Sequence, residues 1–193
     1  MLEKLKKNKD IKTIKEHDKL IEIECEKNKV LSLLKKLKEN NDFIFDQLLD
    51  ITAVDNPSRD RRFDLIYIIQ SLKKNKKLIL QTSLKENESI ETITSVYKAA
   101  DWYERECYDL FGIEFTNHPD LRRIMTDYNF EGHPLRKDFP LTGHTEVRYN
   151  EDQKKVINEP VKLEQNYRNF DYESPWEGTK YIKDQTNIND KKN

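Results

Sequence analysis

The stretch RFDLIYIIQSLKKNKKLILQT, residues 62–82, decides the expected fold. Two runs rich in β-branched and aromatic residues, 62–71 and 77–82, flank the polar segment LKKNK at 72–76. Such runs favour strands, and a short polar segment between them is typical of a β-hairpin. The lysines indicate that the tip of this hairpin is exposed. The sequence therefore predicts an antiparallel pair of strands here.

Upstream segments extend this pair into a sheet with a helix. Apolar residues in 20–25 predict a strand, and those in 30–37 then recur at helical spacing. Residues 43–54 read as a further extended segment. The turn formers DNPS at 55–58 predict a break after it.

Downstream, apolar residues recur every three or four positions from Ile90 to Leu110. Ser89 is placed to cap the start of a helix and Gly112 to end it, which predicts one helix of about six turns. The order of elements predicts an α+β fold, with helices on one face of a small, mainly antiparallel sheet and a long extended C-terminal tail. We expect an N-terminal extension at 1–17, the α+β domain at 18–112 and the tail at 113–193.

The tail combines five prolines with many scattered aromatic residues. It is too aromatic for plain disorder and too broken for a second core. Extended segments with aromatic anchors gain affinity by filling pockets in another surface. The tail is therefore predicted to wrap a partner protein. The aromatic residues behind this prediction are Phe115, Tyr128, Phe130, Phe139, Tyr149, Tyr167, Phe170, Tyr172, Trp176 and Tyr181.

Composition weighs against several classes of protein. The 35 basic residues nearly balance the 36 acidic ones, so no strong field favours nucleic acid. No apolar run reaches the roughly 18 to 20 residues of a membrane-spanning helix, and the first twenty residues have no signal-peptide or transit-peptide character. The two cysteines, Cys25 and Cys107, cannot supply the four thiolates usual for an iron–sulfur cluster. No histidine has a second ligand at metal spacing, so we expect no metal in this chain.

Four charged residues, Glu104, Arg105, Glu106 and Asp109, lie within one and a half turns of the expected helix. Their spacing allows ion pairs between positions i and i+4. Paired carboxylates can also serve as general acid and base, so a hydrolase or lyase stays open as the rival interpretation. Ion pairing at a helix end or a partner surface is the favoured one.

A second charged group, His133, Arg136, Lys137 and Asp138, lies between two prolines. Proline fixes the local backbone, so this segment is predicted to be rigid, with charges that pair across an interface. A ligand site for an anion is the alternative.

Both groups lie in motifs that resemble the thirty-kilodalton subunit family of respiratory complex I, whose members carry the letter C. The first motif is YERECYDLFGI at 103–113 and the second is FEGHPLRKDFPLTG at 130–143. The following residues, 146–178, resemble the tail of mitochondrial and related bacterial members. The resemblance covers about residues 20–178.

The resemblance implies a non-catalytic core scaffold subunit of NADH:ubiquinone oxidoreductase. Such a protein would clamp the neighbouring quinone-site subunit, which carries the letter D, in the peripheral arm. It would support electron transfer from NADH to quinone, coupled to proton translocation. FMN and iron–sulfur clusters would belong to partner subunits, with no catalytic, cofactor or metal residue in this chain.

The resemblance also implies a location. The matrix side of the mitochondrial inner membrane is the expected one, with the cytoplasmic face of a bacterial membrane as the alternative. The equivalent subunit of a membrane-bound hydrogenase, or of the plastid relative of complex I, is a further alternative for the assembly.

Overall fold

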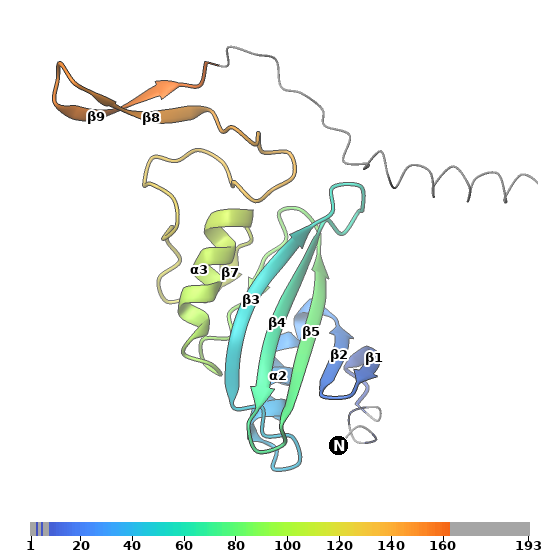
Figure 1. Cartoon of the computed structure of the whole chain (residues 1–193). Coiled ribbons are helices and arrows are strands. Elements are labelled where there is room, and N and C mark those ends of the chain that lie inside the picture. Colours follow the sequence, from blue (N-terminus) through green and yellow to red (C-terminus); the bar gives the residue numbers. More distant parts are fainter. Residues whose placement is uncertain (1–2, 4, 6–7, 163–193) are drawn as a thin grey trace, which may run out of the picture. The chain divides into compact units, whose positions relative to one another are not determined.

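The computed structural model describes residues 3, 5 and 8–162 (Figure 1). They fall into two compact units, one ending at Gly143 and one beginning at His144, and each is described by itself. The first unit contains β1 (Ile11–His17), β2 (Leu20–Cys25), η1 (Lys27–Lys29), α2 (Val30–Glu39), β3 (Gln47–Asp55), β4 (Phe63–Ser71), β5 (Lys76–Leu84), β6 (Ile90–Glu91), α3 (Ala100–Phe111) and β7 (Phe115–Thr116). The second contains β8 (Thr145–Asn150) and β9 (Lys155–Pro160).

A five-stranded sheet with strand order β1-β2-β5-β4-β3 forms the frame of the first unit. The predicted hairpin is confirmed, since β4 and β5 pair antiparallel from Phe63 opposite Leu84 to Ser71 opposite Lys76. The pairs β1–β2 and β3–β4 are also antiparallel, and β2–β5 is the one parallel pair of this sheet. The sheet is therefore mainly antiparallel, as predicted.

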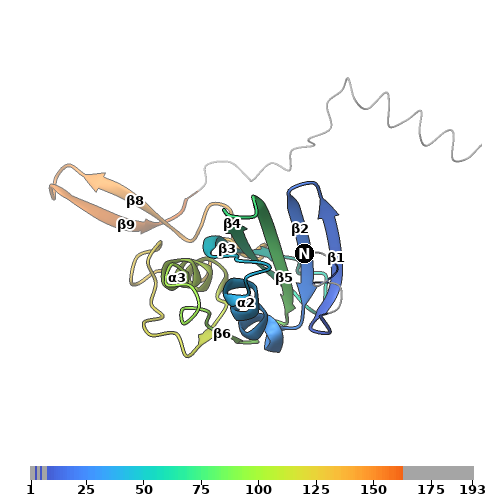
Figure 2. The ribbon, with the colours of Figure 1, turned by 90° about the horizontal axis from the view of Figure 1, so that it is seen from below.

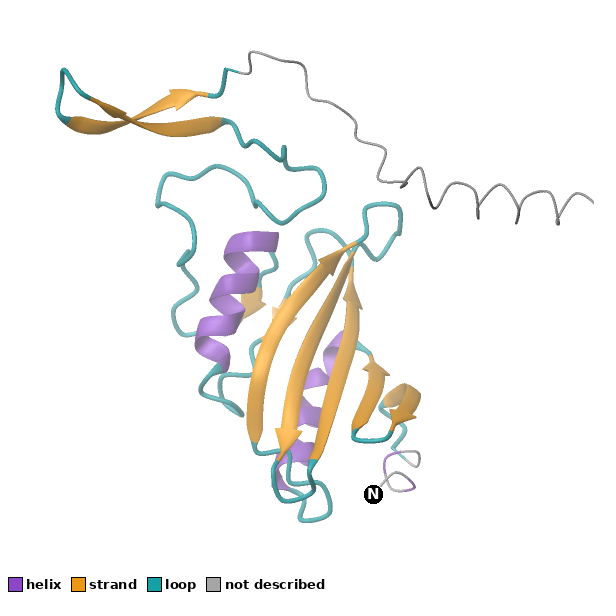
Figure 3. Cartoon of the chain, in the orientation of Figure 1, coloured by secondary structure: helices purple, strands orange, loops and turns teal. Residues whose placement is uncertain are grey.

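Helices α2 and α3 cover the same face of the sheet (Figures 2 and 3). Alternate residues of β4 are buried against them because successive strand side chains point to opposite faces. Helix α2 buries Val30, Leu33, Leu34 and Leu37, which recur at helical spacing. Burying each such aliphatic side chain contributes about 1.5–3 kcal/mol. The predicted α+β fold is confirmed.

The helix predicted from Ser89 begins at Ala100 instead, and this prediction was wrong by three turns at its start. Ile90 and Glu91 form strand β6, which pairs in parallel with β7. The segment ETITSV at 91–96 is rich in β-branched and hydroxyl side chains, which favour extended or turn conformations over a helix. The predicted end at Gly112 is confirmed by its left-handed conformation, with φ of 74°.

The first unit is larger than the expected domain at 18–112. Strand β1 lies within the expected N-terminal extension, where it pairs with β2 and packs Ile11 and Ile14 against the core. On the other side the unit continues to Gly143, because Phe115 is buried beside Ile90 and polar contacts hold the following loop. Residues 163–193, including five of the tail's aromatic residues, lie outside the described residues.

Candidate functional site

The C-terminal end of α3 is the meeting point of the two signature motifs. Gly112 follows the helix with φ of 74°, and its N–H donates to the carbonyl of Tyr108 at 2.9 Å. A Cβ at this position would collide with Nη2 of Arg136 and would lie 2.6 Å from Nε2 of His133. Glycine is thus required twice, for a backbone conformation that other residues adopt at a cost and for the close approach of the second motif.

The second motif caps the last carbonyls of α3. We call residues 132–140 the strap. Nδ1 of His133 lies 2.8 Å from the carbonyl oxygen of Asp109, and the N–H of Leu135 donates to Leu110 at 3.0 Å. Nε of Arg136 donates to the carbonyl of Phe111 at 2.6 Å. A helix leaves its final carbonyls without intrahelical partners, so the strap satisfies three of them and places a cation at the negative end of the helix dipole.

His133 contributes to this cap as a neutral side chain. Its Nδ1 must carry the proton, because the carbonyl of Asp109 can only accept. Burial lowers the pKa of His133, the hydrogen bond to Asp109 raises it, and the charges of Arg136 and Arg123 lower it further. The net effect is a pKa below the ordinary value, which favours the neutral ring.

Asp109 holds the loop that precedes the strap. Its carboxylate, buried at the side chain, accepts three backbone N–H groups, from Ile124, Met125 and Thr126, at 2.7–3.0 Å. It also accepts the Thr126 hydroxyl at 2.6 Å and Nη1 of Arg123 at 2.8 Å. Burial alone would raise the pKa of Asp109, but the hydrogen bonds from Thr126, Met125 and Arg123 lower it to about 2. The carboxylate therefore stays ionised, with both oxygens engaged.

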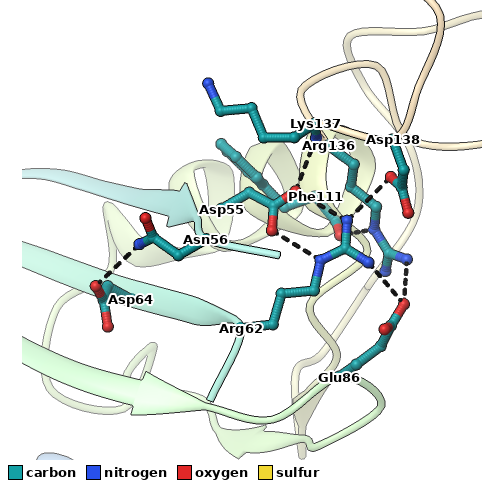
Figure 4. A network of polar contacts seen from close by, with 9 residues as sticks. All are labelled: Asp55, Asn56, Arg62, Asp64, Glu86, Phe111, Arg136, Lys137 and Asp138. Carbon is teal, nitrogen blue, oxygen red and sulfur yellow. Dashed lines mark hydrogen bonds and ion pairs between the residues drawn. The ribbon is translucent and has the colours of Figure 1, made fainter. Parts of the chain in front are cut away.

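A network of charges fastens the strap to the end of the sheet (Figure 4). Arg62 binds Asp55 through two bonds of 2.7 and 2.9 Å, and both side chains are almost fully buried. The backbone N–H of Lys137 donates to Asp55 at 2.7 Å, and Asp138 lies 3.0 Å from Arg62. Because the Arg62 guanidinium donates to it, the pKa of Asp55 lies below its ordinary value despite burial.

Glu86 completes this network as the shared partner of two arginines. Its Oε1 lies 3.1 Å from Arg62 and 3.3 Å from Arg136. The sequence predicted that the strap's charges pair across an interface. In the structure Arg136 and Asp138 have partners within their own chain, and the side chain of Lys137 is exposed.

Glu104 performs a second internal task at the start of α3. It is fully buried, and its carboxyl accepts the N–H of Ile93 at 2.8 Å and the hydroxyl of Thr92. Burial raises the pKa of Glu104 to about 7, although these two hydrogen bonds oppose the increase. Glu104 thereby fixes the turn between β6 and α3.

The other two residues of the first motif lie on neighbouring faces of the helix. Arg105 is 7% exposed, and its Nε donates to the carbonyl of Arg122 at 3.2 Å. Glu106 is half-buried. The predicted i,i+4 ion pair between Arg105 and Asp109 does not form, because Arg123 and the loop occupy the carboxylate.

This arrangement is suited to holding segments of the chain together. The oxygens of Asp109 and Glu104 accept hydrogen bonds from the chain itself, so neither carboxylate is presented to a substrate. Within residues 3, 5 and 8–162, no group of three or more His, Cys, Asp or Glu side chains could hold a metal ion. No helix in that part of the chain is long and apolar enough to cross a membrane.

Sequence reasoning missed Asp55, Arg62 and Glu86, which were not among the candidate residues. One signal was available for Asp55, because strand alternation from Ile51 and Ala53 places it on the buried face. A charge at a core-facing position requires a partner. The partner itself could not be identified, since Arg136 and Glu86 are 50 residues apart in sequence and Lys137 and Asp55 are 82.

Comparisons with known proteins agree with these motifs. The family model described as respiratory-chain NADH dehydrogenase, 30 Kd subunit, matches residues 23–145. The corresponding subunit of the NADH-quinone oxidoreductase of Cereibacter sphaeroides is 53% identical over 155 residues, which are 80% of this chain and 78% of that protein. The corresponding subunit from a Ruegeria species is 50% identical over 162 residues, which are 84% of this chain and 81% of that protein.

Solved structures share the fold. The trypsin-resistant fragment 1-134 of Nqo5 superposes with a TM-score of 0.52 at 25% identity, covering 62% of this chain and 96% of the fragment. A chain of an archaeal membrane-bound sulfane sulfur reductase superposes with a TM-score of 0.64 at 24% identity, covering 81% of this chain and 96% of its own. The second likeness concerns the fold alone. With its signature motifs joined at the end of α3 and its relatives about 50% identical, the chain belongs to the 30 kDa subunit family of respiratory complex I.

Proposed function

We propose that this chain is a structural subunit of the peripheral arm of NADH:quinone oxidoreductase, with no active site of its own. In this proposal it clamps the quinone-site subunit, and FMN and iron–sulfur clusters belong to partner subunits. The family supports membership of the complex, and the clamping role rests on the second unit of the chain.

The observation that carries the proposal is the two-faced character of the β8–β9 hairpin. Its register places Val147 opposite Asn158 and Tyr149 opposite Val156, so these residues share one face with Thr145 and Pro160. None of the six is charged. The opposite face carries Glu146, Arg148, Lys155 and Glu159, with an ion pair of 2.6 Å between Arg148 and Glu159. The hairpin is therefore amphipathic.

The uncharged face is uncovered within the described residues of its unit. Val147 is 65% exposed, Tyr149 55% and Val156 63%. An isolated two-stranded hairpin is marginally stable in water, and exposed apolar groups on one face are typical of a surface that binds another protein. A partner that covers this face would stabilise the hairpin and bury the three side chains together.

The internal network of the first unit supports the same role. Because Asp109, Arg62 and Asp55 fix the strap to the sheet and to α3, the chain offers a rigid base for assembly. Its contribution to electron transfer is positional, since groups held by a neighbouring protein lose rate when displaced by about an ångström.

The test is a pair of matched hairpin variants. Val147→Ser with Val156→Ser changes the uncharged face, and Glu146→Ser with Lys155→Ser changes neighbouring positions on the charged face. The first variant should lower the amount of assembled complex on native gels by about tenfold, because roughly 1.4 kcal/mol of lost contact changes an association constant tenfold. The second variant should assemble normally.

The remaining assembled particles carry the distinction from an enzyme. They should reduce quinone at a near-normal rate per particle and retain the quinone-site subunit, since no reacting group has changed. Normal assembly of the uncharged-face variant would remove the hairpin from the clamp. A large fall in rate per particle for Glu104→Gln, with normal assembly, would favour the acid–base interpretation.

Location follows the complex in this proposal. The matched relatives named above are bacterial, which favours the cytoplasmic face of a bacterial membrane over the mitochondrial matrix side. The chain would sit there at the periphery, through its partner subunits. Extraction of membranes with carbonate or chaotropic salt should release it together with other peripheral subunits. Release only by detergent would contradict this placement.

A further inference from the structure

Arg105 is a buried cation without an ion pair in the described part of the chain. Only 7% of the residue is exposed, and its one hydrogen bond there runs from Nε to the backbone carbonyl of Arg122. An isolated buried charge is costly unless it is paired. Arg105 is therefore the one signature charge for which the described residues of the first unit supply no charged partner.

The nearby carboxylates are already engaged. Asp101, one turn before Arg105, lies 3.3 Å from Nε2 of His118. Asp109, one turn after it, accepts Arg123 and the 124–126 loop. Asp120 pairs with Arg122 at 2.9 Å. Helical spacing would bring Asp101 or Asp109 to Arg105, yet each carboxylate binds another group.

An exposed indole lies against this cation. The guanidinium carbon of Arg105 lies 5.1 Å from the centre of the Trp102 ring, within the range of a cation–π contact. Trp102 is 62% exposed, although it sits on a helix between buried positions. Tryptophan and arginine are among the residues most enriched at the positions that dominate binding energy in protein interfaces.

We propose that Trp102 and Arg105 form a docking site for a segment of another protein of the complex that carries an Asp or Glu beside an apolar side chain. The carboxylate pairs with the free edge of the Arg105 guanidinium, and the apolar side chain packs on the Trp102 ring. This site deepens the proposed function and rests on it, since it requires the chain to assemble with partner subunits. It lies on α3, in the first unit, and is separate from the hairpin face.

Charge complementarity selects a protein carboxylate over an anionic membrane surface. Glu106 follows Trp102 by one helical turn, and Asp101 precedes Arg105 by one, so acidic groups flank the single unpaired cation of the described motif. A lipid surface presents many negative charges, which these carboxylates would repel. A single carboxylate on a folded partner avoids that repulsion.

The experiment converts the unpaired cation into a cross-linking group. Arg105→Lys places an amine at the site, and a water-soluble carbodiimide joins an amine to a carboxylate only when the two are in direct contact. The variant complex is assembled, treated and analysed by mass spectrometry. Arg122→Lys is the matched control, because Arg122 is exposed and paired with Asp120 of its own chain.

The expected result is a zero-length cross-link from position 105 to an Asp or Glu of a different protein in the complex, at least tenfold more abundant than any such link from position 122. Links from position 105 confined to carboxylates of its own chain, or absent, would overturn the proposal. A complex that lacks the chain altogether would instead count against the proposed function.

A second measurement needs no substitution. Hydroxyl-radical oxidation of Trp102 is compared between the free chain and the assembled wild-type complex. We expect at least a fivefold decrease on assembly, because the partner segment covers the ring. Equal oxidation in both states would overturn the proposal, whatever the behaviour of the Arg105 variant.

Discussion

The strap and the β8–β9 hairpin lie in one stretch of sequence after α3 and share a proline-containing, aromatic character, yet their contacts differ. The strap satisfies the last carbonyls of α3 and joins the Asp55–Arg62 network. The hairpin pairs with itself and exposes an uncharged face. Two segments of similar composition therefore hold different positions, one inside the folded unit and one prepared for a partner.

This difference separates two uses of charge. In the strap, charged groups are matched within the chain, so their removal changes the stability of the chain itself. In the hairpin the charges lie on the face opposite the apolar residues, so the binding energy is expected from Val147, Tyr149 and Val156. Most of the charges in the signature motifs thus fasten the fold, and the hairpin contact surface lies elsewhere.

Arg62→Ala is the strongest way to break this comparison. It leaves the buried carboxylate of Asp55 without its two guanidinium bonds, which typically costs about 3–5 kcal/mol. We expect that decrease in the free energy of unfolding of the free chain, measured by urea denaturation. Arg61→Ala is the matched control, because Arg61 is exposed and should cost below about 0.5 kcal/mol. Equal effects would mean that the network does not stabilise the free chain.

The pH dependence of stability gives a second large effect. Because burial raises the pKa of Glu104 from 4.5 to about 7, the folded chain keeps a proton that the unfolded chain releases. The contribution is therefore complete below pH 4.5 and is lost as pH rises toward 7, by roughly 3 kcal/mol at most. Glu104→Gln can keep both hydrogen bonds and should remove this slope.

Asp109 should titrate in the opposite direction. Its pKa is lowered from 3.8 to about 2, so its contribution is complete above pH 3.8 and is lost as pH falls toward 2. Chemical denaturation between pH 2 and 8 measures both windows. A slope between pH 4.5 and 7 that persists in Glu104→Gln would assign it to another group.

Gly112→Ala tests the contact between α3 and the strap. The substitution introduces a Cβ at a positive φ and against the ring of His133, so we expect a loss of about 1–3 kcal/mol in unfolding free energy. In a His133→Ala background the loss should be smaller, because the ring that meets the new Cβ is gone. The same loss in both backgrounds would mean that the backbone conformation alone is responsible.

Arg136→Ala gives the smallest effect and sharpens the comparison most. It removes the bond to Phe111 and a partly exposed pair with Glu86, so we expect the free chain to lose about 1 kcal/mol. Lys137→Ala, whose side chain is exposed, should change almost nothing. If Arg136 instead pairs across an interface, the free chain would keep its stability and the amount of assembled complex would fall.

Local patterns predicted much of the fold. The β4–β5 hairpin, the strand at β2 and the helix at α2 follow from alternation or helical spacing, and Gly112 from the chemistry of helix ends. The start of α3 was wrong because apolar spacing continues through Ile90 and Ile93, where β6 pairs with β7 and Glu104 holds the turn. Pairing over this distance competes with local periodicity and cannot be read from it.

The candidate site was located more readily than it was understood. The motifs identified Asp109, His133 and Arg136 as important, and these residues do meet at the end of α3. Their partners could not be predicted, because a carboxylate such as Asp109 can bind an arginine, a loop of N–H groups or another protein with equal chemical sense. Only the three-dimensional arrangement decides among these.

Hydrogen exchange of the free chain and of the assembled complex tests the central claim most directly. The account predicts that the strap amides of Leu135, Lys137 and Phe139 are protected to a similar extent in both states, because their acceptors lie in the same unit. The β8–β9 amides should exchange quickly in the free chain and at least tenfold more slowly in the complex. Fast exchange of the strap in the free chain, with protection gained only on assembly, would contradict the account.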